Sequence, residues 1–599
     1  MPQGPTCVSA HPCPAPNAAE RTDFRRGRPA WLPVPAPTPS PASAHRCTRA
    51  PLPQVVLGEG PRGDELGRAA HLSHPNPPHY HTPAPTPSSA PTGTPMKRRT
   101  LWPALLSVLL PAALAGQRAD PVRAYVDAHQ PQVIGELVRF LAIPNVANDS
   151  ANIRRNAAAL VEMMGRRGIR TRLLEGGGPP MVFGELPAPG ARTTLLIYAH
   201  YDGQPVDTAR WVGHGPWEPV LRDRALERGG RIIPIPARGS FDAEWRLYAR
   251  SSSDDKGPIV AMMAALDALR ATGRAPRVNL KFLFEGDEEA GSPQLERIVR
   301  EHGALLRSDL VVMADGPQDP SGRPTLVFGA RGITSAQITV YGPNRPLHSG
   351  HYGNWAPNPA MELARLLASM KNDSGRVAIR GWYDDVLPLS PEERAAIAAL
   401  PDDEPAAFGF AVPEGGRGVR RLESIAEPSL NVRGLSSLYV GAQARTLVPD
   451  RAVAELDMRL VPAVAPARQV ERLMAHVRAQ GFHVVSEDPD SATRAAHPRI
   501  ARVVAREGGY GGIRTPFGHS VARRVVEAVR AGSAQPPVLI PTMGGSIPAA
   551  WFPEVLGTQV ILLPTVNPDN NQHAENENLR LGNLWESIRT FAAVMEGTR

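Results

Sequence analysis

Cysteine is nearly absent from this 599-residue chain. The three cysteines, Cys7, Cys13 and Cys47, lie within the first fifty residues, and none occurs from Met96 onward. A disulfide framework, a cysteine nucleophile and a cysteine-ligated metal are therefore excluded for most of the chain. Any metal ion bound there must be held by histidine and carboxylate side chains.

Aromatic residues are also few, at 5%, and the lysines and arginines do not gather with them into a basic stripe. The formal net charge is +8, but nucleic-acid binding needs positive charge concentrated on one surface. We therefore expect no nucleic-acid partner. Apolar residues make up 42% of the chain, and its length exceeds what one hydrophobic core normally serves, so two or more domains are expected.

The N-terminal region lacks the periodicity of helices and strands. Residues 1–95 are rich in Pro, Ala, Ser and Thr, which predicts a disordered extension. Residues 96–116 then combine a basic start, an apolar stretch and a small-x-small site ending at Ala115, a pattern typical of a secretory signal peptide cleaved near that residue.

Because signal peptides begin a protein, we interpret Met96 as the true start and residues 1–95 as an over-extension of the reading frame. The mature chain would then be secreted or periplasmic, without stable membrane insertion. A genuine extension followed by a membrane anchor is the alternative.

From residue 117 the sequence alternates between helical patterns and short, continuous apolar runs. Such runs are typical of strands buried on both faces, so we predict an α/β fold with a mixed, largely parallel sheet flanked by helices. The expected helices span 121–141, 153–165 and 257–270, and the expected strands span 193–199, 278–284, 309–313 and 560–563.

The pattern changes between residues 325 and 487. Strands of alternating polarity at 333–341 and 453–461 and helices at 358–370 and 469–480 predict an inserted α+β domain, with residues 376–433 as long loops. The catalytic domain would consist of residues 117–324 and 488–599, interrupted by the insert at 325–487.

Metal-competent side chains follow each of the four apolar runs. The first run ends at His200-Tyr201-Asp202, the second at an acidic cluster, the third at Asp315, and the fourth leads to His573. In open α/β sheets, ligands bind at the carboxyl ends of the strands. A further pair, Asp254-Asp255, precedes an expected helix, where an Asp can serve as a metal ligand or as a helix N-cap.

The acidic cluster consists of Glu285, Asp287, Glu288 and Glu289. Carboxylates crowded in this way repel one another and raise each other's pKa, so a fold that gathers them usually supplies a cation. The alternative is a solvated acidic turn.

Seven short motifs, in this order, resemble the motif set of the M20 metallopeptidases, and most nearly that of the carnosinase-like dipeptidases. They are H-Y-D at 200–202, S-D-D-K-G-P at 253–258, E-G-D-E-E-A-G-S at 285–292, A-D-G at 314–316, L-H-S-G at 347–350, G-G-S-I-P at 544–548 and H-A-E-N-E at 573–577. The resemblance implies a di-zinc aminopeptidase-like catalytic domain with an inserted lid or dimerisation domain.

The resemblance also implies a site for two divalent metal ions. One ion would be held by His200 and Asp315 and the other by Glu289 and His573, with Asp254 bridging both. These nitrogen and oxygen ligands suit zinc and are acceptable to manganese or cobalt.

Catalytic roles follow from the same resemblance. Glu288 would be the general base acting on a metal-activated water, and Asp202 would orient a histidine ligand. His348, in the insert, would reach the partner's site in a homodimer and stabilise the oxyanion. Without the motif, His348 could equally be a solvated loop residue.

Arg459, Gly545 and Ser546 resemble substrate-binding positions, although Arg459 could equally be an ordinary exposed strand residue. Two features depart from the family pattern, namely Ala249-Arg250-Ser251 in place of G-R-G, and a longer segment at 222–245. We expect them to alter loop packing and the rim of the pocket without removing a ligand.

The sequence therefore predicts metal-dependent hydrolysis of dipeptides or short peptides. An N-acyl amino acid amidohydrolase and a catalytically silent metal- or peptide-binding protein are the alternatives. Glu288 argues against the silent protein, because a binding module needs no base beside a metal ligand.

Overall fold

The computed structural model describes residues 120–403 and 405–597. The predicted extension at 1–95 and the predicted signal peptide at 96–116 lie outside these residues. Within the described part of the chain, no helix is both long enough and apolar enough to cross a membrane.

The larger of the two main sheets has eight strands in the order β1-β2-β7-β3-β8-β20-β9-β18. Its central strands β7, β3, β8 and β20 are parallel, whereas β2 is antiparallel to β7, which confirms the prediction of a mixed, largely parallel sheet. The strands are β1 Arg170–Leu174, β2 Met181–Leu186, β3 Thr194–His200, β7 Asn279–Glu285, β8 Leu310–Met313, β9 Thr325–Val327, β18 Val538–Ile540 and β20 Val560–Leu562.

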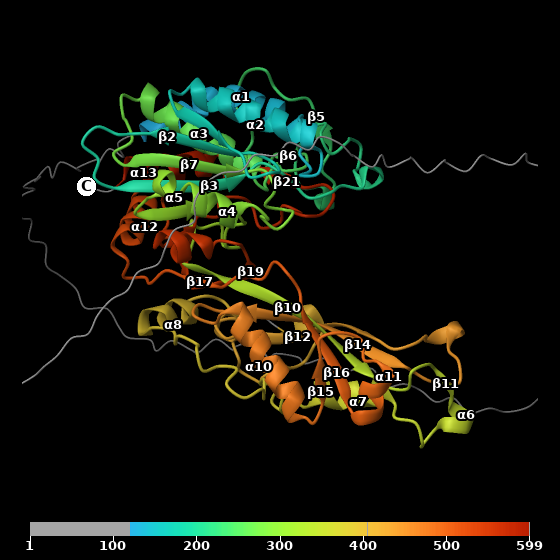
Figure 1. Ribbon diagram of the computed structural model, residues 1–599. Coiled ribbons are helices and arrows are strands. Elements are labelled where there is room, and N and C mark those ends of the chain that lie inside the picture. The colour runs from blue at the N-terminus through green and yellow to red at the C-terminus, as the bar shows by residue number, and fades with distance from the viewer. Residues whose placement is uncertain (1–119, 404, 598–599) are drawn as a thin grey trace, which may run out of the picture. The chain divides into compact units, whose positions relative to one another are not determined.

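Helices cover both faces of this sheet (Figure 1). In β3, Leu195 and Ile197 pack in one core and the alternate residues Leu196 and Tyr198 in another, which explains why the strand is a continuous apolar run. The first core contains α1 Pro121–Leu141, α2 Ser150–Gly165, α3 Lys256–Ala271, α12 Ser520–Gly532 and α13 Leu581–Glu596, and the second contains α4 Leu295–Glu301 and α5 Gly303–Leu306.

The second main sheet has the order β12-β14-β10-β16-β15, with β17 and β19 also paired to β10. Buried and partly exposed residues alternate along β14, because one sheet face packs on α7 and α10 and the other does not. The elements are β10 Gly329–Tyr341, α7 Pro359–Ala368, β12 Ser429–Ser436, β14 Arg451–Leu460, α10 Pro466–Ala479, β15 His483–Val485, β16 Ile500–Ala505, β17 Ile513–Arg514 and β19 Met543–Ser546.

The edges of the two sheets differ from the predicted division at residues 325 and 487. β9 belongs to the eight-stranded sheet, and β16 pairs with β10 in the second sheet. The sequence could not assign β16, because a short strand after a loop does not reveal which sheet it joins.

The expectation of long loops at 376–433 was also too simple. The segment contains α8 (Pro391–Ala398), which begins with a capping box between Ser390 and Glu393, and most of the edge strand β12. Other short helices and strands between residues 340 and 500 are β11 Leu347–His348, α6 Ser349–Tyr352, α9 Arg421–Ser424, β13 Leu447–Val448 and α11 Ser491–Ala496.

A small four-stranded sheet has strands at both ends of segment 222–245, which is longer than the family pattern, and one short strand within it. Its order is β21-β6-β4-β5, with strands β4 Val220–Arg222, β5 Ile232–Ile233, β6 Arg246–Tyr248 and β21 Asn578–Arg580. Because β6 pairs with β21, the residues just after 248 lie beside those just before 578. Two segments of the predicted metal site are thereby joined.

Candidate metal centre

Parallel strand ends bring the predicted metal ligands to one edge of the eight-stranded sheet. His200 is the last residue of β3 and lies in register with Glu285, the last residue of β7. Asp315 follows the neighbouring strand β8 by two residues. These side chains therefore meet at the carboxyl ends of the parallel strands, as the strand pattern predicted.

Five side chains form two groups that share one member. His200, Asp254 and Asp315 can each offer one ligand atom, with these atoms within 4.8 Å of one another. The same holds for Asp254, Glu289 and His573. The structure thus brings together all five predicted ligands, with Asp254 common to both groups.

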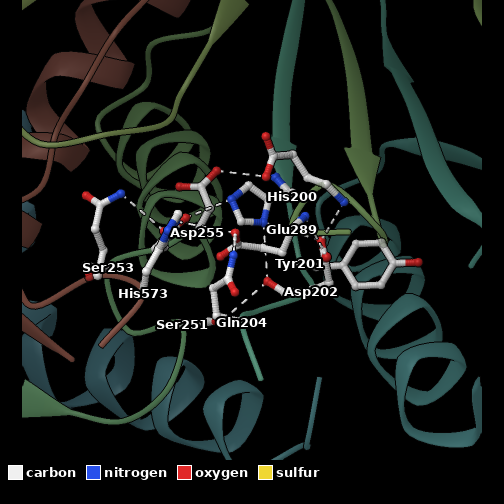
Figure 2. Close-up of polar contacts among 12 residues, drawn as sticks. His200, Tyr201, Asp202, Gln204, Ser251, Ser253, Asp255, Glu289 and His573 are labelled. Atoms are coloured by element: carbon white, nitrogen blue, oxygen red, sulfur yellow. Dashed lines mark hydrogen bonds and ion pairs between the residues drawn. The ribbon is translucent and has the colours of Figure 1, made fainter. Parts of the chain in front are cut away.

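Both carboxylate oxygens of Asp254 face an imidazole. His200 Nε2 lies 2.8 Å from Asp254 Oδ1, and His573 Nε2 lies 3.2 Å from Asp254 Oδ2. His573 Nε2 also lies 3.4 Å from Glu289 Oε2, to which Gln204 donates a hydrogen bond of 2.6 Å (Figure 2). The geometry is that of a bridging carboxylate between two histidine positions.

Burial and neighbouring charges shift the pKa values of the acidic groups at this site. Burial raises the pKa of Glu288 to about 8, that of Glu289 to about 7 and that of Asp315 to about 6. The hydrogen bond to Asp254 raises the pKa of His573 to about 9. Buried acids in such a cluster are costly without a nearby cation, and each group offers imidazole nitrogen and carboxylate oxygen, so the residues fit a divalent metal such as zinc.

Asp202 is fully buried and fixes the residues around it. Its Oδ1 accepts the backbone N–H of Glu288 (3.1 Å), and its Oδ2 accepts that of Glu289 (3.0 Å). His200 Nδ1 lies 3.4 Å from Asp202 Oδ1 and 3.2 Å from the Asp202 carbonyl oxygen (Figure 2). Asp202 therefore holds the histidine and, beyond the sequence prediction, the backbone of the predicted base and its neighbouring ligand.

Sequence reasoning missed Glu577, which organises the loop that carries Asp254. Glu577 is fully buried, and its Oε2 accepts from Arg250 Nη1 (2.8 Å) and Ser251 N (2.8 Å). Its Oε1 accepts from Ser253 N (2.9 Å), Ser253 Oγ (2.8 Å) and Asp254 N (3.0 Å). The only available signal was its position four residues after His573 in the H-A-E-N-E motif.

Ser251 stands where the family pattern has glycine. Its φ of 62° lies in the left-handed region that glycine adopts more readily. The hydroxyl accepts a hydrogen bond from Asn145 Nδ2 (2.8 Å) and donates to the Asp202 carbonyl oxygen (3.4 Å). A Cβ at Gly203 would lie 2.4 Å from this hydroxyl, so Gly203 leaves room for the substitution.

The two members of the Asp254-Asp255 pair have different environments. Asp255 occupies the N-cap position of α3, but its side chain makes no capping hydrogen bond and instead accepts the His200 backbone N–H at 3.3 Å. Asp254 belongs to both ligand groups. The N-cap alternative is therefore not supported for either side chain.

Glu285 and Asp287, which had no predicted role, are interior residues. Glu285 is fully buried and accepts a 2.5 Å hydrogen bond from Tyr198 Oη. Asp287 is 2% exposed and accepts a 2.8 Å bond from Gln294 Nε2. Their burial rules out the alternative of a solvated acidic turn.

The other predicted site residues lie in or beside the second sheet. His348 is exposed, and its Nδ1 accepts the Gly350 backbone N–H at 3.1 Å, so a neutral ring carries its proton on Nε2. Arg459 Nη1 donates to Ser546 Oγ at 2.7 Å, and Gly545 precedes that serine on β19. The structure thus joins Arg459 to Ser546, whereas within the described part of the chain His348 forms no hydrogen bond or ion pair with the five predicted ligands.

The sequence matches one peptidase family and is similar to dipeptidases of that kind. The model of peptidase family M20/M25/M40 matches residues 196–597. Human Beta-Ala-His dipeptidase is 27% identical over 533 residues, covering 82% of this chain and 96% of the relative. A Cys-Gly metallodipeptidase of Schizosaccharomyces pombe is 26% identical over 497 residues, covering 79% of this chain and 96% of the relative.

Solved structures resemble the fold over a similar range. An M20 family metallo-carboxypeptidase from Sulfolobus solfataricus superimposes with a TM-score of 0.62 at 29% identity, covering 78% of this chain and 98% of that one. Human carnosine dipeptidase 1 gives a TM-score of 0.56 at 24% identity, covering 80% and 98%.

Proposed function

Because the chain belongs to peptidase family M20/M25/M40, we propose that this metallopeptidase hydrolyses the peptide bond of dipeptides or short peptides. The observation that carries the proposal is the pair of ligand groups sharing Asp254, with Glu288 directly beside the ligand Glu289. A binding protein would need the ligands but not an adjacent base.

Two divalent ions would occupy the site, and zinc is the metal we propose. His200, Asp254 and Asp315 would hold one, and Asp254, Glu289 and His573 the other. When bound, the ions would supply Lewis acidity toward the scissile carbonyl and the attacking water.

Glu288 is the proposed general base. Its carboxylate takes a proton from the water that attacks the scissile carbonyl carbon, and the proton then passes to the leaving amine nitrogen. The backbone N–H of Glu288 is held by Asp202, so the base has a fixed place relative to Glu289 and His200. Asp202 is thus a positioning residue for both the base and the metal ligands.

His348 is proposed to act across a homodimer. With Nδ1 occupied by the Gly350 N–H, its Nε2–H is free to donate to the oxyanion that forms during attack. Exposed apolar side chains near it and along the edge strand β12 fit burial against a second copy, among them Trp355 (78% exposed) and Leu435 (63% exposed).

A complementation assay tests this role. His348→Ala and Glu288→Ala variants should each be inactive, but a mixed dimer contains one site with Glu288 from one subunit and His348 from the other. Equal mixing should restore about one quarter of wild-type activity, because half the dimers are mixed and each has one complete site. Absence of restored activity in verified mixed dimers would exclude a role across the dimer.

The substrate assay uses purified, zinc-loaded protein and a panel of dipeptides, tripeptides and N-acetyl amino acids. We expect hydrolysis of dipeptides, and Glu288→Gln should lower kcat at least about 100-fold while bound zinc is retained. Glu301→Gln, at an exposed α4 position, is the matched control and should leave turnover unchanged. Failure to cleave any peptide would refute the proposal, and cleavage of N-acetyl amino acids alone would favour an amidohydrolase.

Export is a separate proposal. The pattern at residues 96–116 supports a start at Met96 and cleavage near Ala115, giving a secreted or periplasmic enzyme. N-terminal sequencing of the protein recovered from its native compartment should begin close to residue 116, and a first residue upstream of Met96 would overturn this.

A further inference from the structure

Asn145 is a fully buried residue in the loop between α1 and α2, and it joins the segment after β3 to the segment before α3. Its Nδ2 donates to the carbonyl oxygen of Tyr201 (2.9 Å) and to Ser251 Oγ (2.8 Å). Its backbone carbonyl oxygen accepts the N–H of Gly203 at 2.9 Å. One residue is thereby bonded to both chain neighbours of Asp202 and to the loop that leads into α3.

The orientation of the Asn145 amide follows from its partners. Trp217 Nε1, which can only donate, lies 3.2 Å from Asn145 Oδ1. The carbonyl oxygen of Tyr201 can only accept, so Nδ2 faces it. Because Nδ2 also donates to Ser251 Oγ, the serine hydroxyl is left to donate to the Asp202 carbonyl oxygen at 3.4 Å. Both polar atoms of the Asn145 side chain thus have partners, and a flipped amide would lose them.

The hydrogen bond from Ser251 ends on the atom that orients the predicted ligand His200. His200 Nδ1 lies 3.2 Å from the same carbonyl oxygen of Asp202 (Figure 2). Since a carbonyl oxygen only accepts, Nδ1 carries a proton. Nε2 is the nitrogen that faces Asp254, 2.8 Å from Oδ1, so a metal ion shared by these two ligands would bind at Nε2. A histidine that binds metal through Nε2 needs its proton on Nδ1.

We infer that Asn145 positions the ligands of one of the two proposed metal ions, the first ion, whose ligands are His200, Asp254 and Asp315. Asn145 fixes the His200 segment against the Asp254 loop, and through Ser251 it fixes the carbonyl group that orients the imidazole. This inference rests on the two-ion site of the proposed function, but it does not depend on the substrate.

Partners that never touch an ion still change metal affinity, because the ligands must be held in place before the ion binds. Replacing Asn145 by alanine removes all three side-chain hydrogen bonds that join these segments. The second ion should depend on Asn145 less, because its ligands Glu289 and His573 lie on other segments, after β7 and before β21. The described hydrogen bonds of Asn145 reach neither segment.

Cobalt titration of the full chain, freed of metal by chelation, tests the inference without turnover. Cobalt accepts the same nitrogen and oxygen ligands as zinc, and its visible absorption reports the geometry around the ion. Wild type should bind two ions. Asn145→Ala should bind one of them about 10- to 100-fold more weakly and with an altered absorption spectrum, and the other within about 3-fold of wild type. In a His573→Ala background, which retains the ligands of the first ion, the weakening should persist.

Asn156→Ala is the matched control. Asn156 is also fully buried, and its Nδ2 donates to the carbonyl oxygens of Pro144 and Asn152, both at 2.8 Å. It supports the same loop, but these hydrogen bonds reach neither segment that Asn145 joins, so both ions should bind as in wild type. Equal weakening by Asn156→Ala and Asn145→Ala would show that general packing of the loop controls the site, and would overturn the inference.

Ser251→Ala tests the route through the Asp202 carbonyl group. It removes the hydroxyl between Asn145 and Asp202 and should weaken the first ion about 10-fold. The double variant should bind no more weakly than Asn145→Ala alone, because both changes break one network, and additive losses would overturn the inference. Thermal unfolding identifies a variant that does not fold. If Asn145→Ala fails in this way, Ser251→Ala decides, and an unchanged cobalt affinity and spectrum would overturn the inference.

The same titration separates this inference from the proposed function. A wild-type chain that binds no cobalt would refute the metal site on which the proposed function depends. Two ions bound with the same affinities and spectra by wild type and Asn145→Ala would refute the role of Asn145 alone.

Discussion

Replacing Glu577 by glutamine should disturb the metal centre without touching a metal ligand. The carboxylate accepts five hydrogen bonds from residues 250–254. Oε1 accepts three of them and Oε2 accepts two. Glutamine has the same shape but keeps only one oxygen, while its amide nitrogen is itself a donor.

The size of the effect follows from which donors lose their acceptor. In its better orientation the glutamine oxygen serves Ser253 and Asp254, and its NH2 group then faces Arg250 Nη1 and Ser251 N. Each buried donor left without an acceptor costs about 1–3 kcal/mol, so the free energy of unfolding should fall by about 2–6 kcal/mol. Because the loop carries Asp254, zinc affinity should fall about 10- to 100-fold.

Denaturant unfolding and zinc titration of the same variant check both numbers. Glu575→Gln is the control, since Glu575 lies two residues away and pairs with Arg210, whose side chain is 67% exposed. Loss of this ion pair should lower the free energy of unfolding by at most about 1 kcal/mol and leave zinc affinity unchanged. If Glu577→Gln matched this control in both measurements, the view that Glu577 fixes the loop would be refuted.

Three further outcomes are expected. Chelation should lower the melting temperature, and zinc should restore it, because a ligand at 100 times its Kd stabilises the native state by about 2.7 kcal/mol; unchanged melting curves would contradict this. The Asp202→Asn variant can accept only one of the two backbone N–H groups, at Glu288 and Glu289, that Asp202 accepts. Its zinc affinity, measured by native mass spectrometry, should therefore drop about 10-fold. Asp207→Asn is the control. Asp569 accepts a hydrogen bond from Arg246, which lowers its pKa to about 2; its stabilisation is complete above about pH 4 and disappears toward pH 2. The difference in unfolding free energy between wild type and Asp569→Asn, about 1 kcal/mol at pH 7 after screening, should therefore narrow in acid, and a constant difference would exclude this linkage.

The meeting of the predicted ligands His200 and Asp315 at one sheet edge could be foreseen because it depends on local patterns, whereas the complete set of five came from the motif resemblance. Parallel strands end at the same sheet edge, so an apolar run followed by His200 or Asp315 already indicates where these side chains meet. Helices α1, α2 and α3 were predicted for a similar reason, since α1 shows its apolar spacing directly in the sequence, but α13, which is as long as α2 and α3, was not predicted.

Long-range contacts could not be read in this way. Glu577 and its donors are separated by more than 320 residues, and most of the bonds go to backbone N–H groups that every residue type carries. Arg331 of β10 is only 6% exposed, whereas an arginine in a strand would ordinarily be expected to face solvent. In the segment 376–433, the overall Pro- and Gly-rich composition concealed the local capping signal at Ser390 that begins α8.

The contact between the Asp254 loop and Glu577 has a consequence for biosynthesis. Ribosomes make the chain from the N-terminus, and domains fold as their residues emerge. Both His573 and the carboxylate that shapes the loop follow Asp254 by more than 300 residues along the chain. The Asp254 loop therefore cannot take up its final conformation before residue 577 has been synthesised, however early the strands that flank it form.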